Sequence, residues 1–113
     1  MLTIQLLKEF GANTAEGLGR CMNNETFYLR LVGMGLADAG FEKLLAAARA
    51  DDRQAAFEAA HALKGVLGNL ALTPLYTPAS EITELLRSGR DADYAAMAEA
   101  LIEKRDALKK AAE

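Results

Sequence analysis

The stretch Asp51–Ala71, DDRQAAFEAAHALKGVLGNLA, decides how this chain folds. Placed at intervals of about 100°, its residues separate into two helical faces. One face is apolar and should meet a core: Ala56, Ala59, Ala60, Leu63, Val66, Leu67 and Leu70. The opposite face should meet solvent: Gln54, Phe57, Glu58, His61, Lys64, Gly65 and Gly68. We therefore predict a long amphipathic helix from Asp52, whose carboxylate caps it, to about Ala71.

Helical periodicity continues on both sides of this segment, and β-strand alternation is almost absent. Asn13 and Glu16 have the spacing of a capping box, while Gly11 and Gly89 follow helical segments as stop signals. Helices are predicted over residues 3–10, 13 or 14 to about 22, 73–88, and 91 or 92 to the end. Residues 25–50 should form either one helix broken near 37–40 or two short helices.

The helix after residue 72 carries conflicting signals. Thr73 followed by Pro74 is typical of a cap with proline at the first helical position. Pro78 lies one turn further on, where it removes a helical hydrogen bond, so it predicts a kink or a start nearer Thr77. The last helix should turn inward the side chains of Tyr94, Met97, Leu101 and Leu108.

Short connections favour antiparallel neighbours. The predicted fold class is therefore all-α: an antiparallel up-and-down four-helix bundle with an additional short N-terminal helix. A length of 113 residues suits a single domain over residues 1–113 that closes its own core, so we expect a monomer. The start at Met1 and the single bundle favour a small independent protein or a terminal domain.

Composition excludes several function classes. Half of the residues are hydrophobic and a quarter are charged, as in soluble globular proteins. A net charge of −3 and the absence of a Lys/Arg cluster disfavour nucleic acid, and no apolar run approaches the roughly 20 residues that span a bilayer. Direct membrane contact is therefore not expected. Cys21 is the one cysteine, so neither a disulfide nor a zinc site is predicted, and a reducing cytoplasm fits best.

The single histidine, His61, lies in the middle of the outward face. Lys64, Gly65 and Gly68 follow it by three, four and seven positions and are its neighbours on that face. A glycine inside a helix costs roughly 1 kcal/mol relative to alanine, so two of them here indicate that space beside the imidazole matters, although they could instead allow close helix packing. Lysine is a common phosphate partner, and the pattern favours phosphoryl transfer.

The run Ala60–Leu70, AHALKGVLGNL, resembles the signature of bacterial histidine phosphotransfer (HPt) domains, in which an acceptor histidine precedes a hydrophobe, a lysine and a glycine. The surrounding order of helices is similar over most of the chain. The resemblance implies a four-helix bundle with an extra N-terminal helix. It also implies that His61 is the phosphoryl acceptor, that Lys64 is the phosphate-neighbouring cation, and that Gly65 opens the approach.

Other positions follow the family's pattern less closely. The family often orients the acceptor ring with a Gln or Glu on the following helix, and the corresponding residue here is the shorter Thr83. Arg87, one turn later, is expected to offer a second cation. Ala71 stands where relatives commonly carry glycine. Phe57 and Gln54, on the outward face, are predicted partner-docking residues, with the edge of the core as the alternative place for Phe57.

The chain has no glycine-rich nucleotide loop and no metal site, so we expect a phosphoryl carrier, not an enzyme with its own cofactor. A free imidazole is largely deprotonated near pH 7 and can attack phosphorus. The resemblance implies that the partners are response-regulator receiver domains and a hybrid sensor histidine kinase, and that the receiver supplies the phospho-aspartate and Mg²⁺.

Two other function classes remain open. The first is an HPt-like adaptor that docks signalling proteins without being phosphorylated. The second is an enzyme that uses His61 as a general base or metal ligand; no second histidine exists, and Glu58 is the nearest carboxylate along the helix.

Overall fold

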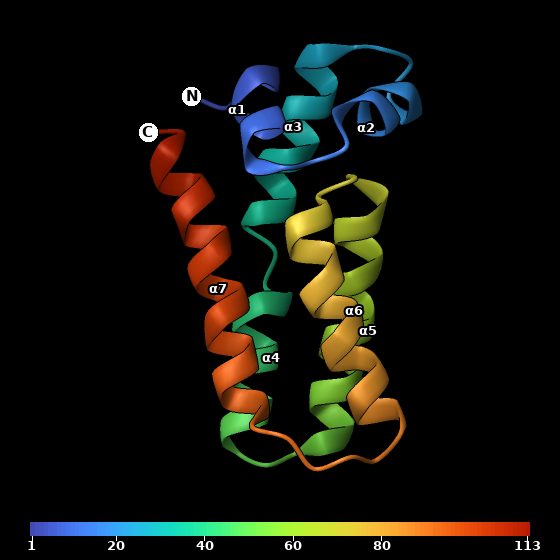
Figure 1. Cartoon of the computed structure of the whole chain (residues 1–113), viewed down its shortest axis with the longest axis vertical. Helices are drawn as coiled ribbons and strands as arrows, with labels where there is room; N and C mark the ends of the chain where they lie inside the picture. Colours follow the sequence, from blue (N-terminus) through green and yellow to red (C-terminus); the bar gives the residue numbers. More distant parts are fainter.

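The computed structural model describes all 113 residues and contains seven α-helices and no strand. Figure 1 shows their arrangement. The helices are α1 (Ile4–Phe10), α2 (Thr14–Arg20), α3 (Glu25–Leu36), α4 (Gly40–Arg49), α5 (Arg53–Asn69), α6 (Thr73–Arg87) and α7 (Tyr94–Ala111). The predicted all-α class is confirmed. None of the seven helices has the length and apolar character needed to cross a membrane.

Helices α4 to α7 form the predicted antiparallel up-and-down bundle. Both α4 and α6 pack against α5 and α7, which closes a ring of four helices (Figure 1). Helix α3 lies above α4 and is separated from it by a short break, where Asp38 Oδ2 accepts the Gly40 N–H at 2.8 Å. The expected 25–50 segment is therefore two helices. Helices α1 and α2 lie beside α3 at that end of the molecule.

The ends of α5 follow the rules for helix caps. Asp52 accepts the Ala55 N–H at 3.1 Å and so binds a free donor of the first turn. At the other end Ala71 adopts a left-handed conformation with φ 57°, and Leu72 N–H donates to Leu67 O at 3.1 Å. This is a Schellman motif, which usually has glycine at the left-handed position. Ala71 is thus an alanine in a conformation that favours glycine.

Helix α6 corrects two expectations. It begins at Thr73 with Leu72 as its N-cap, and no side chain caps it, so Thr73 is not the capping residue. Pro78 lies inside the continuous helix, so a start near Thr77 is wrong. Helix α6 tolerates the lost hydrogen bond because Leu75 is fully buried and tertiary packing, more than local preference, stabilises a helix.

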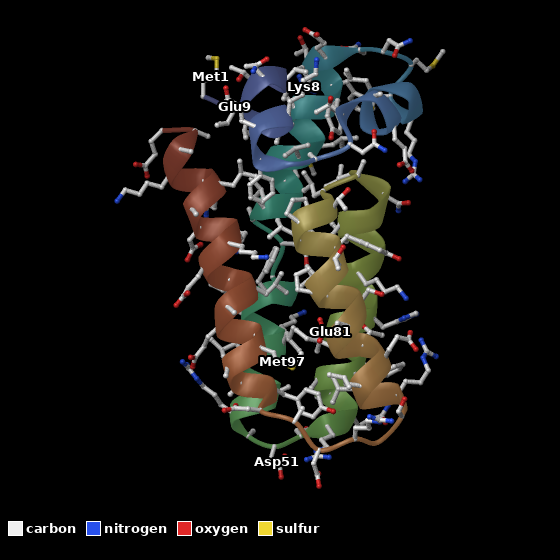
Figure 2. All side chains as sticks on the ribbon, viewed as in Figure 1. Met1, Lys8, Glu9, Asp51, Glu81 and Met97 are labelled. Atoms are coloured by element: carbon white, nitrogen blue, oxygen red, sulfur yellow. The ribbon has the colours of Figure 1, made fainter.

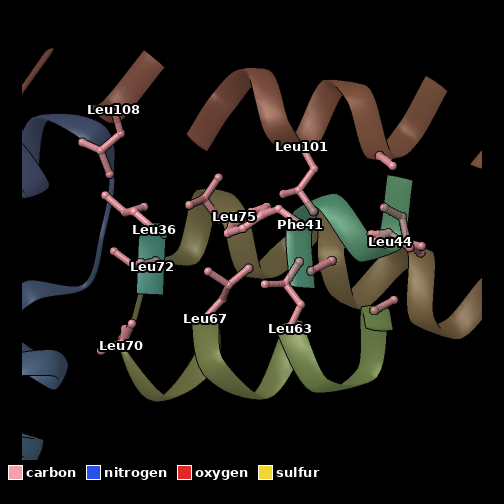
Figure 3. Close-up of a cluster of buried hydrophobic side chains, with 14 of the residues drawn as sticks. Leu36, Phe41, Leu44, Leu63, Leu67, Leu70, Leu72, Leu75, Leu101 and Leu108 are labelled. Atoms are coloured by element: carbon pink, nitrogen blue, oxygen red, sulfur yellow. The ribbon is translucent and has the colours of Figure 1, made fainter. Parts of the chain in front are cut away.

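The core lies between the four bundle helices and extends upward to α1 and α3. Figure 3 shows part of it, with leucines of α5, α6 and α7 meeting Phe41. The predicted apolar face of α5 is confirmed, since Leu63 and Leu67 are fully buried. On α7 the side chains of Tyr94, Leu101 and Leu108 are buried and that of Met97 partly so. Each fully buried leucine contributes roughly 1.5–3 kcal/mol.

A buried arginine ties α7 to α3 and α4. Arg105 is 6% exposed, and its Nη1 donates to Leu36 O at 3.0 Å, the last residue of α3. Its Nη2 donates to Glu42 Oε1 at 2.8 Å, and its Nε to Asp106 Oδ1 at 2.7 Å. The hydrogen bond from Arg105 lowers the pKa of Glu42 below its ordinary value. Arg105 therefore binds the carbonyl at the break between α3 and α4.

Three hydrogen bonds connect the N-terminal segment to the last turn of α5 and to the residues that follow it. Tyr28 Oη donates to Leu70 O at 2.8 Å, and Asn13 N–H to Ala71 O at 2.9 Å. Arg20 Nη1 donates to Gly68 O at 2.9 Å. The first 35 residues are thus attached to the C-terminal end of α5. At the opposite end of the molecule, Asp51 marks the turn between α4 and α5 (Figure 2).

Candidate functional site

His61 lies midway along α5 and is exposed. The helix cannot rotate to hide it, because Leu63 and Leu67 on the other side are fully buried in the core. The sequence predicted an apolar and an outward face for this helix, and burial of the apolar face places the imidazole at the surface.

A cleft of about 600 Å³ opens beside His61, between α5, α6 and α2. Four residues of the predicted outward face of α5 line it: His61, Lys64, Gly65 and Gly68. The remaining lining residues are Glu16, Arg20, Asn69, Ala71, Thr73 and Tyr76. Most of these are polar, so the cleft suits a polar or charged group.

The two glycines of this face differ in what they leave open. A Cβ atom on Gly65 would have nothing within 4 Å, so this position is open space beside the imidazole. A Cβ atom on Gly68 would come within 3.0 Å of the Tyr76 ring from α6. Gly68 therefore makes room for helix packing, which was the alternative interpretation, while Gly65 leaves room for another molecule.

Two cations of the site share one carboxylate. Lys64 Nζ lies 3.7 Å from Glu84 Oε1, and Arg87 Nε lies 3.3 Å from Glu84 Oε2. Lys64 comes from α5, and Glu84 and Arg87 from α6. Ion pairs at a surface contribute about 0–1 kcal/mol, so Glu84 places both cations without fixing them firmly.

Aromatic and cationic groups also stack at this site. The rings of Phe57 and His61 have centroids 5.7 Å apart and planes that differ by 8°. Arg87 Cζ lies 5.2 Å from the centroid of the Phe57 ring, in the geometry of a cation–π interaction. Arg87 is therefore beside the site, as expected, but it contacts Phe57 and Glu84.

Two other predicted residues lie further from the cleft. Thr83 is fully buried, and its hydroxyl donates to Ala79 O at 2.8 Å within α6. It makes no hydrogen bond to the imidazole, because its side chain is buried in the core whereas His61 is exposed. Gln54 is exposed on the outward face and its Nε2 donates to Glu58 Oε1 at 3.1 Å.

Sequence reasoning did not assign several residues of this site, among them Glu84, Tyr76 and Arg20. Glu84 has the spacing of an ordinary solvated ion pair with Arg87, so nothing in the sequence predicted its contact with Lys64 of α5. Tyr76 and Arg20 come from other helices, and no local pattern links them to His61. Helical spacing places Glu84 one turn before Arg87 on the same face of α6, but it does not predict the contact of Glu84 with Lys64 on α5.

No group of three or more His, Cys, Asp or Glu side chains is arranged to hold a metal ion. The thiol of Cys21 is buried and belongs to the core.

Comparison with known families gives one match. The model of the Hpt domain family matches residues 36–111, which is more than half of the chain and includes all of α4 to α7. No curated protein and no solved structure showed significant similarity. Hpt domains are phosphocarriers that interact with receiver domains in phosphorelays. With its four-helix bundle and the match across it, this chain belongs to the Hpt domain family.

Proposed function

We propose that His61 accepts a phosphoryl group from the phospho-aspartate of a receiver domain and passes it to the aspartate of a second receiver. One observation carries this proposal. The chain's single histidine is exposed in the middle of α5, beside the open space at Gly65 and the ammonium of Lys64. In an Hpt domain this is the arrangement that phosphoryl transfer requires.

The chemistry needs little from the carrier. An unprotonated ring nitrogen of His61 attacks phosphorus, and the bond from phosphorus to the aspartyl oxygen breaks. Aspartate leaves as a carboxylate, and the other ring nitrogen of His61 releases its proton. Because such transition states carry charge on three equatorial oxygens, catalysis is mostly positioning and electrostatic stabilisation.

Lys64 and Gly65 have different roles in this transfer. Gly65 admits the receiver's active-site loop to the imidazole. Lys64, bound loosely to Glu84 at 3.7 Å, can turn toward a dianionic phosphoryl group, which attracts it more strongly than one carboxylate does. The receiver supplies Mg²⁺, and this chain needs no cofactor of its own.

The partners follow from this role. We infer that the donor is the receiver of a hybrid sensor histidine kinase and that the acceptor is a response regulator. The polar cleft beside His61 fits the acidic, metal-binding surface of such a receiver. The chain acts as a cytoplasmic monomer, over residues 1–113 as one domain, without nucleic acid or membrane contact.

The test uses a panel of purified receiver domains charged with labelled acetyl phosphate and Mg²⁺. Label should move to the wild-type chain, should be labile in acid and stable in base, and should be absent from His61→Gln. Circular dichroism of His61→Gln checks that the bundle is intact. Because the chain has one histidine, label with the acid lability and base stability of phosphohistidine can only lie on His61. Failure of every receiver to label the wild type would instead favour an adaptor that docks without being phosphorylated.

A further inference from the structure

The imidazole of His61 has one directional contact within the chain. Its plane lies nearly parallel to the ring of Phe57, one turn earlier on α5, with a centroid separation of 5.7 Å. Offset stacking of this kind is a favoured arrangement of aromatic pairs. The hydrogen bonds and ion pairs around it run between other residues, such as Gln54 with Glu58 and Lys64 with Glu84.

Phe57 is itself contacted from the next helix. The Arg87 guanidinium lies over its ring at 5.2 Å, and Arg87 Nε lies 3.3 Å from Glu84 Oε2. Helix α6 therefore reaches the acceptor ring through a cation and an aromatic side chain. Thr83 makes no such contact, because its side chain is buried in the core and its hydroxyl donates to Ala79 O.

We propose that Phe57 is the positioning residue of the acceptor site and holds the imidazole plane by stacking. This inference rests on the proposed role of His61. A stacked ring is contacted on its face, which leaves both nitrogens at its edge free for the phosphoryl group and for release of the proton. Orientation by a hydrogen bond would occupy one of those two nitrogens.

Three variants distinguish an effect of aromatic stacking from an effect of side-chain size. Phe57→Leu keeps an apolar side chain but removes the aromatic face, and Phe57→Tyr keeps the face. We expect the rate of phosphoryl transfer to fall about 3- to 10-fold in the leucine variant and to stay within about twofold in the tyrosine variant. Phe27→Leu is the matched control, because Phe27 is a 44% exposed phenylalanine on α3.

Two phosphodonors distinguish positioning from docking. With a receiver, a positioning role predicts a lower maximal rate of transfer to Phe57→Leu at an unchanged half-saturating receiver concentration. With phosphoramidate, which needs no docking surface, the same variant should again be slower. A higher half-saturating concentration together with normal labelling by phosphoramidate would make Phe57 a docking residue and overturn the inference.

Nuclear magnetic resonance tests the stack independently of phosphorylation. The single histidine gives one set of imidazole signals, which the Phe57 ring current should displace. The displacement should be lost in Phe57→Leu and retained in Phe57→Tyr and Phe27→Leu. Absence of label on the wild type with both donors would refute the proposed function and leave this readout intact. Imidazole signals that do not move in Phe57→Leu would refute the stacking.

Discussion

Replacing Gly65 should raise stability and lower activity at once. The residue lies inside α5, and a Cβ atom there would meet nothing within 4 Å. Alanine is favoured over glycine by about 1 kcal/mol in a helix interior, so Gly65→Ala should be more stable by about that amount. For a domain of this size the gain corresponds to a rise in Tm of about 4 °C.

The same methyl group narrows the approach to His61. A displacement of about 1 Å at a reacting centre can reduce a rate about 100-fold, so we expect receiver-dependent phosphorylation to slow about 10-fold in Gly65→Ala and about 100-fold in Gly65→Gln. Thermal unfolding followed by circular dichroism and single-turnover transfer from a labelled receiver measure the two effects.

Gly33 provides the matched control. It lies inside α3, away from the cleft, and a Cβ atom there would be 3.9 Å from Leu2 Cδ1, an ordinary contact. Gly33→Ala and Gly33→Gln should gain comparable stability without a change in transfer rate. The reasoning is refuted if Gly65→Gln transfers as fast as Gly33→Gln, or if Gly65→Ala is less stable than the wild type.

Three further predictions concern stability. Arg105→Met should lower the free energy of unfolding in urea by about 1–3 kcal/mol, because the Leu36 carbonyl loses its buried donor; a loss below about 0.5 kcal/mol would contradict the role given to Arg105. The pKa of Glu42 is lowered in the folded state, so the ionised carboxylate stabilises the fold at any pH above its unfolded pKa, near 4. This contribution to the free energy of unfolding is lost as the pH falls through the lower pKa of the folded state. The stability difference between wild type and Glu42→Gln should therefore shrink between pH 7 and pH 3, and a constant difference would exclude this linkage. Tyr28→Phe should cost about 1 kcal/mol, because the Leu70 carbonyl loses its hydroxyl donor, and an unchanged urea midpoint would show that the hydrogen bond contributes nothing.

The bundle and the position of His61 could be predicted because both depend on helical periodicity. In α5 a buried stripe through Leu63 and Leu67 leaves only one face for the histidine, and any long helix with such a pattern has the same property. The predicted start of α6 near Thr73 is confirmed, but the alternative start near Thr77 was wrong, because the local rule for Pro78 competed with the burial of Leu75, which is a tertiary effect.

The details of the site depend on contacts between helices, which one sequence does not reveal. Gly65 and Gly68 are equivalent by periodicity, yet only Gly68 faces Tyr76 across the interface with α6. The contact of Glu84 with Lys64 has the same origin. For Thr83 the family pattern suggested the neighbourhood of the ring, but its small side chain turns into the core and binds its own helix.

The turn after α5 has a consequence for how the molecule opens. Ala71 keeps a left-handed conformation that costs a non-glycine residue about 1–2 kcal/mol, and the N-terminal helices hold the adjoining carbonyls through Arg20 and Tyr28. That conformation belongs to the Schellman motif at the end of α5, so it stays when the N-terminal helices detach, and detachment breaks only the contacts that those helices make. Because few hydrogen bonds attach residues 1–35 to this turn, we expect them to open as a cooperative unit below the global unfolding free energy, and amide hydrogen exchange should show it. Because the last turn of α5 lines the acceptor cleft, each such opening also loosens one wall of the cleft.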